Sequence, residues 1–285
     1  MKLYKIAKGI LLEHHNAAYI IDDEWDSLIN RDDLAGYLQA ISTDTTPIDN
    51  AVKSEYLNGQ ISPPIGSQEV WAAGVTYLKS RDARMEESET SGGASLYDRV
   101  YDAPRPELFF KATAQRVAGH GAEVYIRKDS EWDVPEPELT LFINSKGSIQ
   151  GYTIGNDMSS RSIEGENALY LPQAKIYEKS AALGPCLLVT PEPIALESAI
   201  RMTIKRDGVA VYEDATTISR MKRSLTELAG YLYRECDFPA GCFLMTGTCL
   251  VPPPTFTLQP GDVAEISIDG IGTLVNTIAL NPKHK

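Results

Sequence analysis

The chain has 285 residues and a net charge of −12, with 43% hydrophobic and 23% charged residues. This composition is that of an ordinary globular protein, with room for one large domain or for a small domain beside a larger one. So acidic a surface repels nucleic acid and anionic membranes, and no run of about 18 apolar residues is present to span a bilayer. The four cysteines lie in apolar stretches without a CxxC pair, as is usual for thiols in a reducing cytoplasm. We therefore expect a cytoplasmic protein whose partners include neither a membrane nor nucleic acid.

The beginning of the chain predicts a small N-terminal α+β domain. KLYKIAK, GILLE and AAYII have the composition of short strands, and RDDLAGYLQAI has the spacing of a short amphipathic helix. The stretch QISPPIGSQ then interrupts all periodicity with two prolines and a glycine, which is typical of a linker. The sequence therefore predicts a small domain over residues 1–65 and a larger domain over residues 66–285.

The larger domain is rich in predicted strands, namely EVWAAGV, ELFFK, AEVYI, ELTLFI, QGYTIGND, GPCLLV, VAEISI and GTLVNTIA. AIRMTIKRDGVAVYED predicts a hairpin that turns at Asp207 and Gly208. TISRMKRSLTELAGYLY predicts one long helix, because its apolar residues are spaced three and four apart. Many short strands with few helices predict an α+β, mainly β fold, and no glycine-rich phosphate motif supports nucleotide binding.

The segment DVPEPELTLFI carries two acidic residues at the start of a predicted strand. Glu136 and Glu138 are two positions apart, so their side chains point to the same side of the strand. Two adjacent carboxylates repel each other unless a cation or a proton lies between them. Oxygen ligands without a nearby His or Cys favour Mg²⁺, with Mn²⁺ or Ca²⁺ as substitutes. Taken alone, however, this pattern is more often a solvated face.

Three further segments hold charged residues beside buried-looking strands. Asp157 ends the strand GYTIGND, where an acid is as often a helix cap as a metal ligand. Glu107 and Lys111 bracket the aromatic pair of ELFFK, either as part of a site or as a simple ion pair. Lys175 lies between apolar residues, and a lone lysine is normally a surface group.

Taken in order, these segments resemble the fumarylacetoacetate hydrolase-like family over roughly residues 69–278. The landmarks are GVTY at 74–77, the LFFK strand, the ExE pair, NDMSSR, the buried-looking lysine and MTGT at 245–248. The resemblance implies a catalytic domain built on a curled mixed β-sheet, with a metal at its mouth. It also implies a homo-oligomer, a dimer or a tetramer. By motif, the metal ligands are Glu136, Glu138 and Asp157, the active-site lysine is Lys175, and Thr248 contacts substrate.

One departure from this family concerns the segment that follows GVTY. Members that hydrolyse carbon–carbon bonds carry a His and a Glu where this chain has Ser80 and Ala83, and its four histidines lie elsewhere. Without an imidazole, a hydrolytic water lacks the base best matched to neutral pH. The variant segments are similar to those of sugar-acid dehydratases. These enzymes convert a 2-keto-3-deoxy-pentonate, the arabinonate or the xylonate, into 2,5-dioxopentanoate.

This resemblance implies a Mg-dependent dehydration of a small 2-keto acid through a metal-stabilised enolate. Glu107 is expected to be either an outer metal ligand or the base at C3, and Lys175 either transfers a proton or binds the substrate carboxylate. Arg81 and Arg84, with the run ETSGGASLYDR, predict a lid over the substrate, or else an ordinary solvated loop. Tyr77 and Ser80, from the same segment, are expected to contact substrate.

Two other functions remain open at this point. The same metal ligands would suit a C–C bond hydrolase or a decarboxylase of acylpyruvate-like 2-keto acids, although Ser80 in the His position disfavours hydrolysis. The chain could also be a non-catalytic binding protein with a degenerate site. Retention of all three carboxylates and of Lys175 argues against that reading.

Overall fold

A computed structural model describes residues 1–87 and 94–283. Its larger sheet follows the order β3-β2-β1-β13-β11-β10-β16-β5-β6, with β4 paired to β1 and β7 paired to β13. Neighbouring strands are mostly antiparallel, but β16 pairs with β5 in parallel. The strands are β1 (Lys2–Ile6), β2 (Gly9–His14), β3 (Ala17–Ile21), β4 (Ile61–Ser62), β5 (Glu69–Gly74), β6 (Glu107–Thr113), β7 (Val117–Ala118), β10 (Pro137–Ile143), β11 (Ile149–Asp157), β13 (Ala181–Leu188) and β16 (Cys242–Met245).

A second sheet packs against the first, with β11 in contact with its strands β17 and β18. The inward-facing residues Ile200, Met202 and Ile204 of β14 alternate along the strand and are fully buried. The predicted hairpin is confirmed, because Asp207 and Gly208 both have positive φ at the turn between β14 and β15. In order, the strands are β15 (Val209–Thr217), β14 (Ala199–Arg206), β17 (Val263–Ile268), β18 (Gly272–Leu280) and β8 (Glu123–Ile126).

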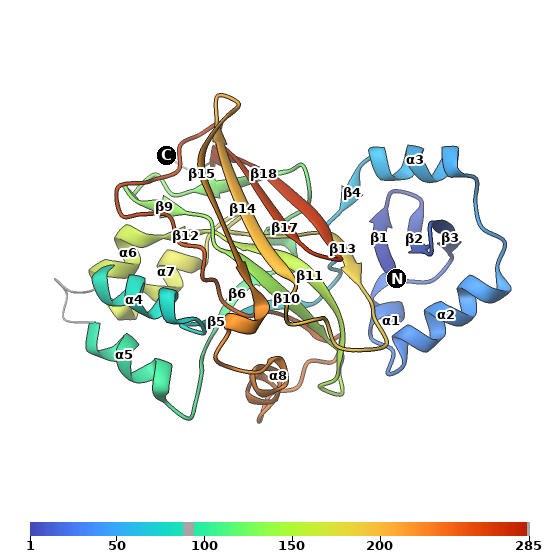
Figure 1. Ribbon diagram of the computed structural model, residues 1–285, viewed down its shortest axis with the longest axis horizontal. Helices are drawn as coiled ribbons and strands as arrows, with labels where there is room; N and C mark the ends of the chain where they lie inside the picture. Colours follow the sequence, from blue (N-terminus) through green and yellow to red (C-terminus); the bar gives the residue numbers. More distant parts are fainter. Residues whose placement is uncertain (88–93, 284–285) are drawn as a thin grey trace.

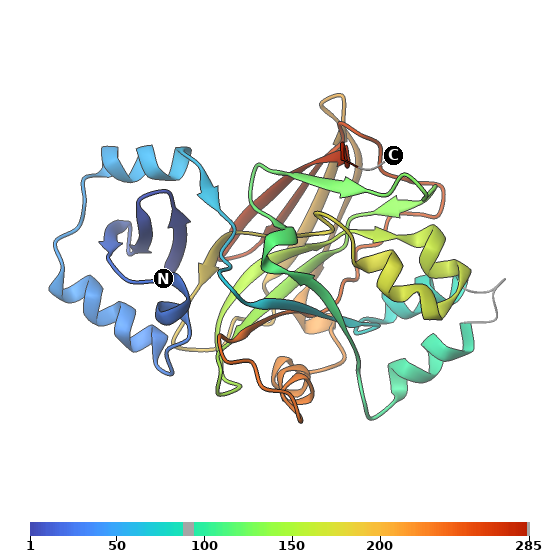
Figure 2. The same cartoon turned by 180° about the vertical axis from the view of Figure 1, so that it is seen from behind.

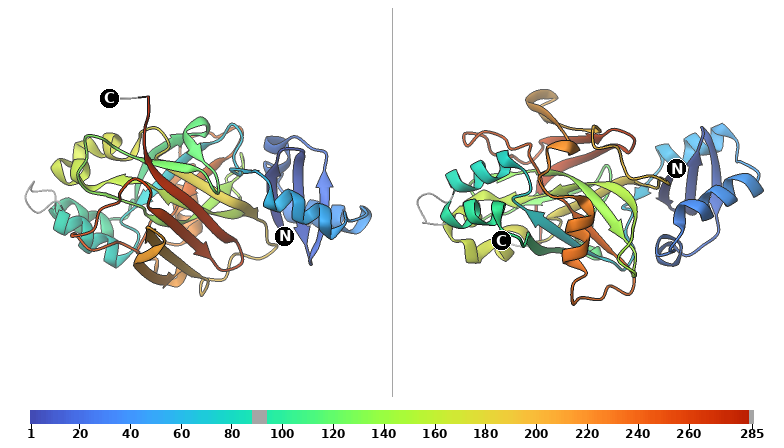
Figure 3. Two further views of the ribbon diagram at one scale, coloured as in Figure 1. Left: turned by 90° about the horizontal axis from the view of Figure 1, so that it is seen from above. Right: turned by 60° about the horizontal axis from the view of Figure 1, so that its bottom comes forward.

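The N-terminal residues form a lobe at one end of the molecule (Figures 1 and 3). Strands β1–β3 pack there with α1 (Trp25–Ile29), α2 (Leu34–Asp44) and α3 (Asn50–Asn58). The lobe continues the larger sheet, because Lys2 of β1 lies opposite Leu188 of β13. Most of its buried residues, including Leu3 and Leu12, belong to the same apolar cluster as Phe142 and Phe243. The division at residue 65 therefore stays a prediction.

Short helices gather at the opposite end of the sheets, as Figures 1 and 2 show. They are α4 (Leu78–Glu87), α5 (Ala94–Asp102), α6 (Arg161–Glu166) and α7 (Leu171–Lys175). Beside them, β9 (Asp133–Val134) and β12 (Ser159–Ser160) form a two-stranded sheet. Among the described residues, no helix is long and apolar enough to cross a membrane. The overall architecture is mainly β, as the strand pattern predicts.

The long helix predicted over TISRMKRSLTELAGYLY is wrong in its extent. The structure has a 3₁₀ turn at Ile218–Arg220, and α8 covers only Leu225–Leu232. The hydroxyl of Ser224 caps α8 by accepting from the backbone N–H of Glu227. The intervening segment is held by distant groups instead, since the N–H of Lys222 donates to the carbonyl of Thr76. A cap and a long-range bond therefore override the helical spacing.

Candidate metal centre and active site

Three carboxylates meet where β10 and β11 lie side by side. Glu138 belongs to β10, Glu136 precedes that strand, and Asp157 ends β11. One oxygen from each lies within 4.8 Å of the others, and all three side chains are buried. The solvated-face alternative for the ExE pair is therefore wrong. The helix-cap alternative for Asp157 is also wrong, because the hydroxyl of Ser160 caps α6.

Two buried lysines neutralise part of this charge. Nζ of Lys175 lies 2.6 Å from Glu136 and 3.3 Å from Asp157, while Nζ of Lys111 lies 2.5 Å from Asp157. Both lysines are fully buried, so the surface interpretation of Lys175 is wrong. Lys111 pairs with Asp157 rather than with Glu107, and it also donates to the carbonyls of Met158 and Lys175. Lys111 therefore connects β6 with the end of β11 and with the end of α7.

Two further charged residues of the site carried no role in the sequence-based prediction. Nη2 of Arg161 donates to Glu136 over 2.5 Å. Glu164, one turn later on α6, forms an ion pair with Arg84 of α4. Both residues are buried. Their spacing could have identified them, because Arg161 ends the NDMSSR segment and Glu164 follows three residues later. Residues three apart lie on one face of a helix.

The donor set fits a hard divalent cation. Burial raises the pKa of Glu138 well above its ordinary value, and the negative charges of Asp157 and Glu136 raise it further. Burial would also raise the pKa of Asp157, but the ammonium groups of Lys111 and Lys175 hold it below its usual range. The backbone N–H of Gly247 donates to Glu138 over 2.6 Å. A cation bound among three carboxylate oxygens would relieve this repulsion, and oxygen ligands of this kind suit Mg²⁺.

Glu107 lies next to the cluster because a glycine leaves space for it. In the ladder between β5 and β6 it stands opposite Gly74, where a Cβ atom would clash with the Glu107 carboxylate. Burial raises the pKa of Glu107, and the positive charges of Arg84 and Lys175 offset part of that rise. A carboxylate with a raised pKa beside a metal site is suited to accept a proton near neutral pH.

Several predicted substrate contacts line the cavity that holds the metal ligands, namely Ser80 and Arg84 of α4 and Thr248 after β16. The structure does not bring Tyr77 or Arg81 into this cavity. Tyr77 is buried and faces a neighbouring groove with Cys249, while Arg81 pairs with acidic side chains outside. The cavity has a free volume of about 10 Å³, which is room for about one water molecule.

The turn from β5 into α4 is strained. Val75 has φ of +53°, a conformation in which a β-branched residue is a true outlier, and it lines the cavity. The next residue is fixed from two sides, because Thr76 donates to the carbonyl of Thr246 and accepts from Lys222. Gly247 has positive φ, and a Cβ atom there would clash with the Thr76 hydroxyl. This packing holds the strained turn that aims Ser80 and Arg84 at the cavity.

The predicted lid falls partly on residues 88–93, which lie outside the described part of the chain. The remainder of ETSGGASLYDR forms the start of α5. Helix α5 is anchored at its C-terminal end, where Arg223 donates to the carbonyls of Val100 and Ala103. The lid therefore stays a prediction.

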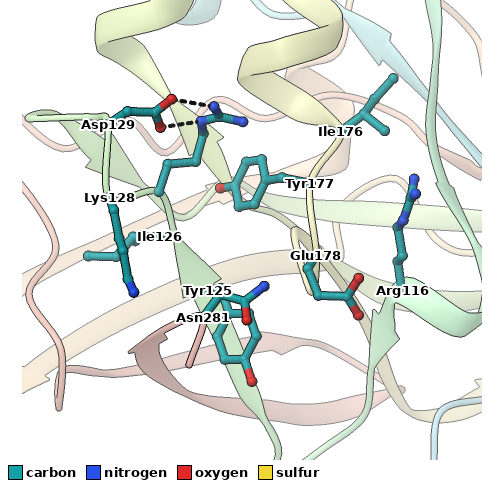
Figure 4. Close-up of a pocket in the computed structure, with 10 residues that line it drawn as sticks. Arg116, Tyr125, Ile126, Lys128, Asp129, Ile176, Tyr177, Glu178 and Asn281 are labelled. Atoms are coloured by element: carbon teal, nitrogen blue, oxygen red, sulfur yellow. Dashed lines mark hydrogen bonds and ion pairs between the residues drawn. The ribbon is translucent and has the colours of Figure 1, made fainter. Parts of the chain in front are cut away.

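A second cavity, of about 460 Å³, is lined by other residues (Figure 4). Figure 4 shows Lys128 and Arg116 on opposite sides of it, with Tyr177 between them. The Tyr177 ring lines this larger cavity, and the cationic groups of Arg127 and Lys111 lie 5.7 and 5.8 Å from its centre. The three clustered carboxylates line the smaller cavity instead, so the smaller cavity is the candidate active site.

Asp133, in β9 near this site, provides a stability prediction. Burial raises its pKa to about 6 from the usual 3.8, so the stability that its protonated form contributes is lost as pH rises toward 6. Asp133→Asn stays neutral at every pH. The variant should therefore gain about 1 kcal/mol relative to the parent between pH 5 and pH 7. Urea unfolding of both proteins across that range checks this, and a constant difference would contradict it.

Together, the fold and the site define a class: an enzyme that holds a divalent cation with carboxylates at the end of a β-rich fold, beside a buried lysine. The family model for the fumarylacetoacetate (FAA) hydrolase C-terminal region matches residues 83–279. The chain belongs to the fumarylacetoacetate hydrolase family.

Two relatives and one solved structure cover most of the chain. A Haloferax volcanii protein, named as a probable 2-keto-3-deoxyxylonate dehydratase, is 48% identical over 84% of this chain and 81% of its own length. The 2-dehydro-3-deoxy-D-arabinonate dehydratase of Saccharolobus solfataricus is 37% identical over 98% of this chain and 96% of its own. A structure of 2-keto-3-deoxy-D-arabinonate dehydratase complexed with magnesium and 2,5-dioxopentanoate has a TM-score of 0.83 and 32% identity, covering 99% of both chains.

Proposed function

We propose that this protein is a Mg-dependent hydro-lyase that dehydrates a 2-keto-3-deoxy-pentonate, the arabinonate or the xylonate, to 2,5-dioxopentanoate. The observation that carries the proposal is the small cavity that three carboxylates and the buried Lys175 line together with Ser80. Hydrolytic relatives carry a His at that position, so this chain retains the metal ligands without the base for water. The names of the two relatives and of the magnesium-bound structure support the same reaction.

Residues in the cavity, and Glu107 next to the carboxylate cluster, have a proposed part in this chemistry. When bound by Glu136, Glu138 and Asp157, Mg²⁺ supplies Lewis-acid polarisation of the 2-keto group. Glu107 accepts the C3 proton, since its raised pKa makes it a stronger base than an ordinary carboxylate. Lys175 donates a proton to the C4 hydroxyl, which leaves as water and leaves a double bond between C3 and C4. This enone then isomerises: one proton leaves C5 and one leaves the C5 hydroxyl, while C3 and C4 each gain a proton, which gives the C5 aldehyde. Contacts to the substrate come from Ser80, Arg84 and Thr248, which line the cavity, whereas Tyr77 and Arg81 lie outside it and have no part in this proposal.

The reaction type is tested by incubating the purified protein and Mg²⁺ with each C4 epimer of the keto-deoxy acid. One epimer should yield the aldehyde with loss of water, and in deuterated water the product should carry deuterium at C3. An acylpyruvate should be cleaved slowly, because loss of a positioned general base typically removes about 10²–10⁴ in rate. Efficient acylpyruvate cleavage without aldehyde from either epimer would instead establish the C–C hydrolase alternative. No turnover of any 2-keto acid would indicate a binding protein.

We further propose a cytoplasmic homo-oligomer, either a dimer or a tetramer. Leu169, between α6 and α7, is 85% exposed, and Tyr170 beside it is partly exposed. Adjacent apolar side chains that are both exposed form the start of a contiguous patch, and contiguous patches mark interfaces. Light scattering of the purified protein measures the mass directly, and a monomer at micromolar concentration would contradict the proposal.

A further inference from the structure

Glu164 is a buried carboxylate to which the proposed chemistry assigns no part. Its side chain is 1% exposed, and it contacts Arg84 of α4 as an ion pair. Two other cations face it at 4.0 Å, namely Nε of Arg161 and Nζ of Lys175. Glu164 does not belong to the carboxylate group that could hold the metal. Burial of an ionised carboxylate is unfavourable unless cations and hydrogen bonds compensate, so the location of Glu164 requires these neighbours.

The same two cations are held from the other side by a metal ligand. Glu136 contacts Arg161 over 2.5 Å and Lys175 over 2.6 Å, so two carboxylates and two cations alternate around a small ring. The oxygens of Glu136 are shared, however, because Glu136 is also a proposed ligand of the cation. Glu164, by contrast, is not a proposed ligand of the cation. It also links this ring to α4 through Arg84, a residue that lines the cavity.

We propose that Glu164 is a positioning residue, which holds Arg84 against the cavity and, together with Glu136, fixes Lys175 and Arg161 around the head group of a 2-keto acid. The inference rests on the proposed function, because it assumes that such an acid binds in this cavity. Without Glu164, Arg84 loses its buried carboxylate partner and no longer lies over the site. Arg84, Lys175 and Arg161 then lose their orientation, while the three proposed metal ligands remain in place.

The direct test compares Glu164→Gln with Glu166→Gln on the same helix. Both variants lose one negative charge, but Glu166 is exposed and serves as the matched control. At saturating Mg²⁺, Glu164→Gln should lower kcat by about 10- to 100-fold, the scale of a small misplacement of groups that position the substrate. Glu166→Gln should stay within about twofold, as expected of a surface substitution. A purely structural role would lower Tm and leave kcat per folded molecule unchanged.

A binding measurement separates this proposal from the proposed function. Oxalate presents the oxygens of a 2-keto acid head group but cannot be dehydrated. Loss of a negative charge alone would tighten the binding of this dianion, whereas loss of positioning should weaken it by about 10-fold at saturating Mg²⁺. Titration calorimetry of the parent, Glu164→Gln and Glu166→Gln shows whether the affinity for oxalate rises or falls. Unchanged or tighter oxalate binding to Glu164→Gln, with normal kcat, overturns the positioning role.

A parent protein that binds oxalate but forms no aldehyde contradicts only the proposed dehydration. If Glu164→Gln fails to fold, Arg84→Met tests the same contact from its other side. Arg84→Met should give the same loss of oxalate affinity, and unchanged affinity would overturn the proposal. Where both variants fold, the double variant should lose less oxalate affinity than the sum of the two single losses, because the two residues share one contact.

Discussion

Replacing Glu138 with glutamine is expected to lower Mg-dependent turnover by at least about 10³-fold, because the cation loses one of three carboxylate ligands and its stabilisation of charge is worth several kcal/mol. The fold should persist, since glutamine has nearly the same shape and can still accept from the N–H of Gly247. Turnover at limiting and saturating Mg²⁺ measures the loss. Glu123→Gln, at a side chain that is 55% exposed on β8, is the matched control.

The metal-free variant should also be more stable than the parent at neutral pH. Because the folded-state pKa of Glu138 is raised above 4.5, its protonated form stabilises the fold at low pH, and that stability is lost as pH rises through the raised pKa. Glutamine does not ionise, so the variant avoids this loss. Thermal unfolding with a chelator should show the gain, and added Mg²⁺ should stabilise the parent far more than the variant. Near-normal turnover of Glu138→Gln at limiting Mg²⁺ would remove Glu138 from the site.

Replacing Lys175 with methionine is expected to lower kcat by on the order of 10² or more, the usual scale for losing general acid–base help. The ammonium group contacts Glu136, Asp157 and the hydroxyl of Ser159, at 2.6, 3.3 and 2.5 Å. Its removal leaves two buried carboxylates without this cation, so the metal-free variant should lose about 3 kcal/mol of stability. Steady-state kinetics and urea unfolding measure the two effects.

Added Mg²⁺ should restore part of this stability without restoring turnover, because the cation replaces the lost charge but not the lost proton donor. Lys146→Met, at a side chain that is 70% exposed, should change stability by no more than about 0.5 kcal/mol and leave kcat alone. Borohydride added with substrate should trap no adduct. A covalent adduct at Lys175 would replace the proposed proton transfer with imine chemistry.

The carboxylate cluster was predictable from sequence because part of its geometry is local. Side chains two positions apart on a strand share a side, which places Glu136 beside Glu138 without knowledge of the fold. Ligand chemistry then indicated a hard cation, and ordered landmarks placed Asp157 and Lys175 in the same site. The core strands followed from the same period of two, as the buried face of β14 shows. Sequence alone therefore determined the fold class, the carboxylate cluster and the reaction class.

Only the tertiary structure decided how the walls of the site are built. Arg161 and Glu164 sit on a six-residue helix, too short to show a periodic pattern, and their partners lie on other elements. Lys111 was visible as a charged residue, but its pairing with Asp157 joins strands 46 residues apart in sequence (157 minus 111). The start of α8 likewise depends on Lys222 reaching Thr76. Contacts between distant segments have no local signature, because each partner's own sequence is compatible with a surface location.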